Sequence, residues 1–146
     1  MRIVVQRTLR SSVEVNENLV SKIEQGMVLF VCLEKEDTQE QVEKAVQKIS
    51  SLRIFKDPET DKMSKDIKDV EGEVLAISQF TLSWRGEKGN RPSFDHSMEP
   101  NKAKELFDKF VGGLRDTGIE VKTGLFGAHM KVQLINDGPV TFCLDF

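Results

Sequence analysis

The stretch Val-Leu-Ala-Ile-Ser-Gln-Phe-Thr-Leu at positions 74–82 is the most informative segment of the 146-residue sequence. Its first four residues are apolar, which is typical of a strand buried on both faces. If the strand runs to its last residue, Ser78 and Phe80 point to one face of the sheet, and Gln79 and Thr81 point to the other. Two interpretations stay open. Either the strand reaches the end of the sheet and its polar side chains bond to neighbouring backbone, or they form the wall of a pocket.

The other strands are predicted from a similar composition. Valine and isoleucine are frequent in short segments bounded by turn residues, as expected of strands packed against a core. Asn16-Glu17-Asn18 is typical of a turn, and Asn136-Asp137-Gly138-Pro139 lies between two apolar segments, which predicts a hairpin. The segments expected to be strands are 2–9, 13–15, 28–33, 132–135 and 140–144.

Two amphipathic helices are predicted. The first begins at Asp37 or Thr38, because Thr38 and Gln41 form a capping-box pattern. The second has Pro100 in its first turn and ends near Gly118. Apolar residues recur at helical spacing in both helices. They are Val42, Ala45, Val46, Ile49 and Leu52 in the first, and Ala103, Leu106, Phe107, Phe110, Val111 and Leu114 in the second.

The order of these elements is strands, helix, strand, helix and strands. This order predicts an α+β fold with a mainly antiparallel sheet and the helices on its outside. The polar segment 56–69 contains Pro58 and is expected to be mostly loop. No repeat or linker interrupts the sequence, and its length fits one hydrophobic core, so residues 1–146 are expected to form a single domain.

The charge of the protein limits how it can bind nucleic acid. A net charge of −3 and a pI near 5.5 argue against a broad positive surface that coats RNA or DNA. A local basic patch is compatible with this charge, and the segment 83–100 concentrates Arg85, Lys88 and Arg91, so it is the best candidate for RNA contact. Neither a signal peptide nor a membrane-spanning run is recognisable, so a cytoplasmic protein is expected.

The usual catalytic groups are scarce. The two histidines, His96 and His129, have no nucleophile beside them in the sequence, so a histidine-based triad is disfavoured. Cys32 and Cys143 lie in apolar segments, which favours reduced thiols over a disulfide. The sequence lacks the HExxH and CxxC spacings of metal sites and the glycine motifs of nucleotide sites, so no metal or cofactor is expected.

Two motifs and their separation resemble the signature of the D-aminoacyl-tRNA deacylases. They are Ser78-Gln79-Phe80-Thr81-Leu82 and Asn136-Asp137-Gly138-Pro139-Val140-Thr141. Shorter similarities extend the resemblance over nearly the whole chain, at 5–7, 34–38, 52–55, 88–94 and 123–130. Cys32 stands where the family often has glycine, and Thr8 stands where valine is common. Neither departure touches the two motifs.

The resemblance implies a compact, barrel-like fold, a homodimer, and hydrolysis of the ester that joins a D-amino acid to the 3′-terminal adenosine of tRNA. In the family the Gly-Pro bond is cis and reaches into the partner's active site, so Gly138 and Pro139 are expected to reject L-amino acids with their backbone carbonyls. Glycine has no side chain, so glycine mischarged on alanine tRNA is a second expected substrate. Arg7 is expected to support the Gly-Pro motif. Phe126 and Met130 are expected near the adenine or the pocket wall.

Four residues, Ser78, Gln79, Phe80 and Thr81, are expected to carry the chemistry. By resemblance, Ser78 and Gln79 hold the substrate and Phe80 shapes the pocket, while backbone N–H groups near Phe80 stabilise the oxyanion. Two mechanisms are open. Either the 2′-hydroxyl of the adenosine helps to position or activate water, or Thr81 acts as a nucleophile; the first is favoured because no base lies near Thr81 in the sequence. The alternative functions are a non-catalytic module that binds aminoacyl-tRNA and a deacylase that also accepts small L-amino acids.

Overall fold

One curved sheet organises the protein. The computed structural model describes residues 1–86 and 89–146, and within these residues six strands join in the order β2-β1-β3-β6-β7, with β8 paired to β1. The strands are β1 (Arg2–Val15), β2 (Asn18–Ile23), β3 (Gly26–Cys32), β6 (Glu73–Ser78), β7 (Glu120–Thr123) and β8 (Lys131–Asp145). The α+β class predicted from the order of elements is confirmed.

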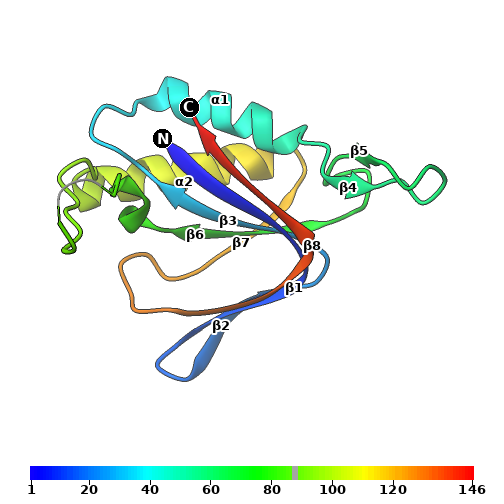
Figure 1. Ribbon diagram of the computed structural model, residues 1–146, viewed down its shortest axis with the longest axis horizontal. Coiled ribbons are helices and arrows are strands. Elements are labelled where there is room, and N and C mark those ends of the chain that lie inside the picture. Colours follow the sequence, from blue (N-terminus) through cyan, green and yellow to red (C-terminus); the bar gives the residue numbers. More distant parts are fainter. Residues whose placement is uncertain (87–88) are drawn as a thin grey trace.

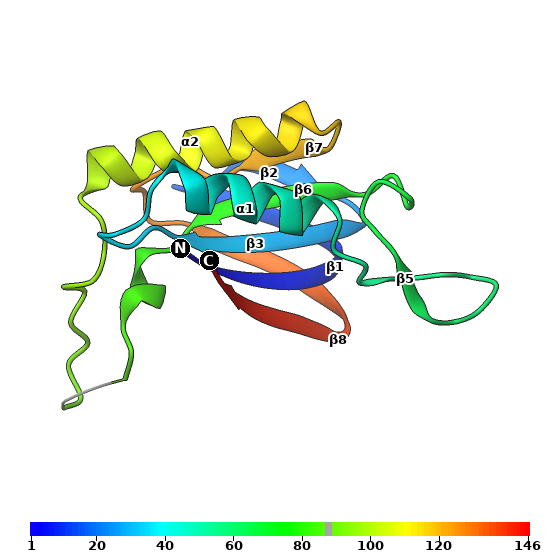
Figure 2. The ribbon, with the colours of Figure 1, turned by 90° about the horizontal axis from the view of Figure 1, so that it is seen from above.

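Both predicted helices are present, and they cover one face of the sheet (Figure 2). They are α1 (Gln39–Ser50) and α2 (Pro100–Asp116). The capping box is confirmed, since the Thr38 hydroxyl accepts from the Glu40 N–H and the Thr38 N–H donates to the Gln41 side chain at 2.9 Å. The apolar faces of the helices pack on the sheet around Leu29, Ala76 and Phe110, which are fully buried in the larger of two hydrophobic clusters.

The strands β1 and β8 bend together and give the sheet its barrel-like curvature (Figure 1). The second half of β1 and the first half of β8, which pair with each other, curl back beneath β3 and β6. Inside this curve lies the second hydrophobic cluster, in which Val13 of β1 and Ile23 of β2 pack with Val28, Leu75 and Ile77 of the central strands. The curled sheet therefore has two packed sides. The helices cover one side, and the curled part of β1, β2 and β8 covers the other.

The predicted hairpin at residues 132–144 is wrong. Both of its arms belong to β8, and each pairs with β1 instead of with the other arm. Gln6 pairs with Thr141 and Thr8 pairs with Asn136, so the four residues 137–140 bulge out opposite Arg7 alone. The physical reason is that β1 is long enough to pair with both arms, which satisfies more backbone groups than a two-stranded hairpin could.

The sheet is mainly antiparallel, as predicted, but it also contains parallel pairs. β1 is antiparallel to β2, β3 and β8, whereas β6 is parallel to both β3 and β7. The helix α1 connects β3 to β6 and α2 connects β6 to β7, and a helical crossover returns the chain in the same direction. The segment 56–69 is mostly loop, as predicted, and its short strand β5 (Met63–Lys65) pairs with β4 (Phe55–Lys56) in a small hairpin.

Candidate active site

A pocket of about 450 Å³ opens at the carboxyl ends of β3 and β6. Most of its wall is apolar. It contains three of the four residues predicted to carry the chemistry, and it also contains Phe126 and Met130. The remaining lining residues are Val31, Leu33, Ile77, Ser97, Met98, Pro100, Ala103, Gly127, Ala128, His129 and Val132. A mostly apolar hollow with a few polar groups is typical of a small-ligand site.

The predicted strand 74–82 ends at Ser78, and its last residues form a 3-10 turn, η1 (Phe80–Ser83). The expected alternation of Ser78 and Phe80 against Gln79 and Thr81 is therefore wrong. The Gln79 N–H still continues the sheet by donating to the Val31 carbonyl at 2.8 Å, after which the chain turns away. This turn sends Phe80 to the pocket mouth, where its side chain is 53% exposed.

Thr81 lies outside the pocket lining and is exposed. Its hydroxyl accepts a hydrogen bond from the Gln79 side-chain amide at 2.6 Å. An amide donor cannot remove a proton from this hydroxyl, so the contact orients the Gln79 side chain without activating Thr81.

The side chain of Cys32 supports the η1 turn. Its buried thiol lies 3.6 Å from the Phe80 carbonyl, in reach of a weak S–H hydrogen bond. Burial, with the nearby carboxylates of Glu34 and Asp37, raises the pKa of the Cys32 thiol to about 12. The thiol therefore keeps its proton at neutral pH. Cys32 and Cys143 are both free, as the sequence predicted.

The wall opposite η1 comes from the start of α2 and from the loop before β8. The Met98 N–H donates to the Leu33 carbonyl at 3.1 Å, which holds the beginning of α2 against the end of β3. Phe126 packs at 6.0 Å between ring centroids against Phe107 of α2. Sequence reasoning missed Ser97, Met98, Pro100 and Ala103 as lining residues, because they are distant from both motifs and only the α2 crossover brings them there.

His129 also lines the pocket, at an exposed position. In the part of the chain that the structure describes, no hydroxyl or thiol donates a hydrogen bond to its ring. Its companion His96 is exposed in the loop before α2, where its backbone carbonyl accepts from the Lys35 N–H at 3.0 Å. The two histidines thus lie in different parts of the structure, and among the described residues neither is hydrogen-bonded to a nucleophile.

The Gly138-Pro139 peptide bond is cis, and it forms the exposed tip of the β8 bulge. Gly138 has a φ of 149°, and a Cβ on it would lie 2.5 Å from the Val140 nitrogen, so glycine is required there. The Asn136 side chain closes the bulge. It accepts from the Val140 N–H at 2.8 Å and donates to the Val140 carbonyl at 3.1 Å.

Arg7 holds this bulge from the sheet side. Its Nε lies 3.1 Å from the Asp137 carbonyl oxygen and 2.9 Å from the Asp137 carboxylate. Its Nη1 donates to the Ile54 carbonyl at 2.6 Å. The Arg7 side chain is buried, so these charged hydrogen bonds are shielded from water and are strong. Arg7 therefore contacts the bulge that carries the Gly-Pro motif, which is the motif that the sequence analysis expected it to support.

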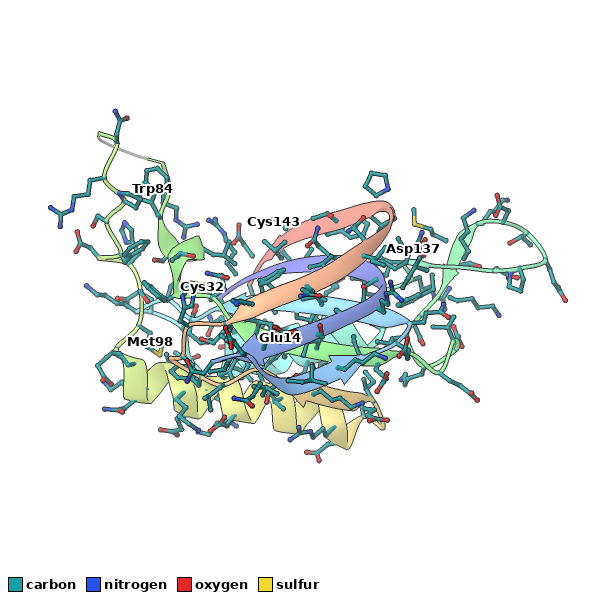
Figure 3. The ribbon with its side chains drawn as sticks, turned by 90° about the horizontal axis from the view of Figure 1, so that it is seen from below. Glu14, Cys32, Trp84, Met98, Asp137 and Cys143 are labelled. Carbon is teal, nitrogen blue, oxygen red and sulfur yellow. The ribbon has the colours of Figure 1, made fainter. Side chains whose placement is uncertain are left out.

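The pocket and the Gly-Pro tip lie at opposite ends of the sheet. Ile3 pairs with Val31 of the pocket wall, whereas Thr8 pairs with Asn136 beside the tip. At about 3.3 Å per residue, the steps from Ile3 to Thr8 along β1 amount to roughly 17 Å. In Figure 3, Met98 of the pocket wall and Asp137 of the bulge lie on opposite sides of the sheet. The tip therefore does not line the pocket of its own chain.

The three residues predicted to contact RNA are in different situations. Arg85 forms a two-pronged ion pair with the Glu34 carboxylate, at 2.8 and 2.7 Å. Arg91 is exposed. Lys88 lies outside the described residues. No helix within residues 1–86 or 89–146 has the length and apolar character needed to cross a membrane.

Comparisons with known proteins agree with this architecture. The family model described as D-Tyr-tRNA(Tyr) deacylase matches residues 4–145. Proteins named D-aminoacyl-tRNA deacylase from Thermotoga petrophila and Clostridium perfringens are 49% and 50% identical to the chain, and both alignments cover 99% of it and 97% of the relative.

Two solved structures share the fold. One, titled c-Myc DNA Unwinding Element Binding Protein, has a TM-score of 0.94 and 40% identity and covers 100% of this chain and 99% of its own. The other, a probable eukaryotic D-amino acid tRNA deacylase, has a TM-score of 0.87 over 99% of this chain and 98% of its own. At 18% identity the second shows the fold alone. By the family model and the close relatives together, the chain belongs to the D-aminoacyl-tRNA deacylase family.

Proposed function

We propose that this protein hydrolyses the ester bond between a D-amino acid and the 3′-terminal adenosine of tRNA, releasing the free D-amino acid and tRNA. One observation carries the proposal: in a chain of this family, Ser78, Gln79 and Phe80 gather on the wall of one apolar pocket. Such a pocket is wide enough for an aminoacylated adenosine and too narrow for a duplex. The protein then acts in translation quality control, as a cytoplasmic proofreading enzyme.

The geometry favours hydrolysis that is assisted by the substrate. Among the residues that the structure describes, the pocket wall has no carboxylate or amine, and its one titratable side chain is His129. A 2′-hydroxyl on the adenosine lies next to the ester and can position or activate the attacking water. Thr81 is a weaker candidate, because its hydroxyl faces the Gln79 amide and has no base beside it.

Donors for the oxyanion are available in the backbone of η1. The first N–H groups of a helical turn have no partner within that turn. Within residues 1–86 and 89–146, no acceptor bonds to the N–H groups of Phe80 and Thr81. These groups can stabilise the negative charge that develops on the ester oxygen. The side chains of Ser78 and Gln79 then hold the substrate in position beside them.

A homodimer with its active sites at the subunit interface follows from the position of the Gly-Pro tip. The tip lies too far from its own pocket to act there, and it is exposed and rigidly held. Phe80 at the pocket mouth is exposed as well. Leu9, Ile135 and Phe142 add exposed apolar surface on β1 and β8, where a second copy can pack. In this arrangement the tip of one chain enters the pocket of the other.

Selection against L-amino acids then needs no contact with the D side chain. Fixed carbonyls of Gly138 and Pro139 exclude the side chain of an L-amino acid by collision, and they accept many D-amino acids. Glycine has no side chain to exclude, so glycine mischarged on alanine tRNA is cleared too. The basic residues Arg85 and Arg91 contribute contacts to RNA near the pocket. Lys88, which lies outside the described residues, is proposed to contact RNA as well.

The test compares D-tyrosyl-tRNA with L-tyrosyl-tRNA and follows the charged fraction with and without the protein. The D ester is expected to disappear rapidly, while the L ester decays at the rate of the protein-free control. Glycyl-tRNA for alanine forms a third arm and is expected to behave like the D ester. Equal stability of all three esters in the presence of bound protein would instead identify a non-catalytic binding module. L-alanyl-tRNA forms a fourth arm, and its loss would identify a deacylase of broader selectivity that accepts small L-amino acids.

A further inference from the structure

A second aromatic ring stands next to the pocket mouth. The ring of Phe94 meets the ring of Phe80 edge to face, with centroids 5.0 Å apart and an angle of 75° between the planes. Phe94 is 36% exposed and Phe80 is 53% exposed. An edge-to-face contact covers one face of one ring, so the contact itself leaves the other ring faces of this partly exposed pair free for stacking.

The backbone that carries Phe94 is fixed. The Phe94 carbonyl accepts from the Ser97 N–H at 2.9 Å, and the residues that follow are tied to the end of β3 through the Lys35 N–H and the Leu33 carbonyl. The Arg85 ion pair with Glu34 anchors the beginning of the same loop. An exposed ring whose following residues are tied to the end of β3 is presented in one place, which reduces the entropy lost when a flat ligand stacks on it.

We propose that Phe94 is a stacking platform for the nucleotide that precedes the terminal adenosine of the tRNA 3′ end. This inference rests on the proposed function, which puts the terminal adenosine in the pocket beside Phe80. Because the Phe94 ring lies 5.0 Å from the Phe80 ring, a base on Phe94 is next to the pocket, as the preceding nucleotide of the same strand must be. The 3′ end of tRNA is single-stranded, and its bases are free to stack on aromatic side chains.

The surroundings of Phe94 fit a nucleic-acid strand. Arg91 is exposed three residues earlier in the same loop and can contact a backbone phosphate. Stacking on an aromatic ring tolerates every base, so this subsite adds affinity for tRNA without choosing among tRNAs. It also explains how a protein of net charge −3 binds RNA, since a stacking contact needs no positive field.

The test compares two substrates that differ only by the RNA that precedes the adenosine: D-tyrosyl-tRNA and 3′-O-D-tyrosyl-adenosine. Phe94→Ala is expected to raise KM for the tRNA by about tenfold, the size of effect seen when a stacking residue is truncated. Its KM for the adenosine ester and its kcat for both substrates should match those of the parent protein. Phe94→Trp should restore the KM for tRNA, because a larger ring stacks equally well.

Met63 supplies the matched control. It is also an exposed apolar residue, but it lies on the β5 hairpin, at the far side of the molecule from η1 (Figure 1). Met63→Ala should leave both substrates unaffected. An equal rise in KM for both substrates with Phe94→Ala would overturn the platform, since Phe94 would then only support Phe80. A change of oligomeric mass in Phe94→Ala would overturn it too, because the ring would then be a contact between subunits.

The platform can be separated from the proposed function by a binding measurement. A labelled, uncharged oligonucleotide with the sequence CCA can be titrated into the parent protein and the Phe94→Ala variant, alongside free adenosine. The variant is expected to bind CCA about tenfold more weakly and adenosine equally well. Equal binding of CCA by both proteins would reject the platform even if the enzyme proves active. Absence of hydrolysis by the parent protein would reject the proposed function instead.

Discussion

The two ends of the β1 strand use polar side chains in opposite ways. Beside Thr8, the side chains of Arg7 and Asn136 bond to backbone atoms of the bulge and fix its shape. Beyond Ile3, the Gln79 side chain of the pocket wall donates to the neighbouring Thr81 hydroxyl, and the pocket stays open. The Thr8 end carries a rigid projection, which is the bulge with the Gly-Pro tip, and the Ile3 end lies beside an open pocket.

This difference fits the proposed selection against L-amino acids, which needs two parts: a rigid group that excludes the L side chain and a pocket that accepts D-amino acids. A carbonyl group can reject a side chain by collision only if it cannot move aside, so the projection must be rigid. A pocket that accepts many D-amino acids must avoid specific contacts with their side chains, so its wall must be mostly apolar. Because roughly 17 Å of β1 separates the two ends, the proposed mechanism requires the projection of one chain to act at the pocket of another.

Gly138→Ala breaks the projection and is expected to have the largest effect. The new Cβ would lie 2.5 Å from the Val140 nitrogen, so the tip must shift and its carbonyls must move with it. A misplacement of about 1 Å at a reacting site costs on the order of a hundredfold in rate, which is the expected loss of kcat/KM for D-tyrosyl-tRNA. Steady-state hydrolysis measures this loss, and circular dichroism checks that the variant is folded. Activity on D-tyrosyl-tRNA equal to the parent's, together with unchanged rejection of L-tyrosyl-tRNA, would contradict a role for the tip.

Mixing two inactive variants tests whether the tip acts on the partner. Ser78→Phe fills the pocket and leaves the tip intact, whereas Gly138→Ala does the reverse. In a randomly mixed dimer population, half of the dimers combine the two chains, and each contains one site with an intact pocket and an intact tip. Activity should therefore recover to about a quarter of the parent's value. No recovery in verified mixed dimers would indicate that each chain acts alone.

Arg7→Met loosens the projection without changing its sequence. It removes the charged hydrogen bonds to the Asp137 and Ile54 carbonyls, so the free energy of unfolding is expected to fall by about 2 kcal/mol. Activity should fall with it, but by less than in Gly138→Ala, because Asn136 still closes the bulge. Urea denaturation measures the stability. Arg10→Met is the matched control, since Arg10 is exposed on the same strand, and a similar loss there would rule out a special role for Arg7.

The helices and most strands of this fold follow from local sequence, because their signals are local. The Thr38 capping box and the apolar faces of both helices determine α1 and α2 without reference to the rest of the chain. The path of the β8 segment does not follow in this way. Its two apolar arms and central Gly138-Pro139 satisfy the pattern of a hairpin, and only the distant β1 strand decides that both arms pair with it.

The candidate site, like the fold, was predictable only where its signals are local in the sequence or come from the family resemblance. Ser78, Gln79 and Phe80 of the first motif mark one wall of the pocket, and the resemblance to a known family adds Phe126 and Met130 to the lining. The other wall, with Met98 and Ala103, carries no polar signal in the sequence and is brought there by the α2 crossover. The end of β6 at Ser78 was also missed, because Phe80 and Leu82 continue the apolar alternation of a strand while adopting a turn.

Thr81→Ala should have the smallest effect. It distinguishes the two possible mechanisms of hydrolysis in the pocket, which are assistance by the 2′-hydroxyl of the substrate and attack by Thr81. The Thr81 hydroxyl lies outside the pocket and accepts from Gln79, so its loss removes one hydrogen bond and should slow turnover by about fivefold at most. A tRNA that ends in 2′-deoxyadenosine, charged with D-tyrosine at its 3′-hydroxyl, removes the other candidate group. The parent protein should hydrolyse it on the order of a hundredfold more slowly, the lower range for loss of a general base. Near-complete loss of turnover in Thr81→Ala with unchanged tRNA binding, together with full activity on the deoxy substrate, would establish Thr81 as the nucleophile and overturn substrate assistance.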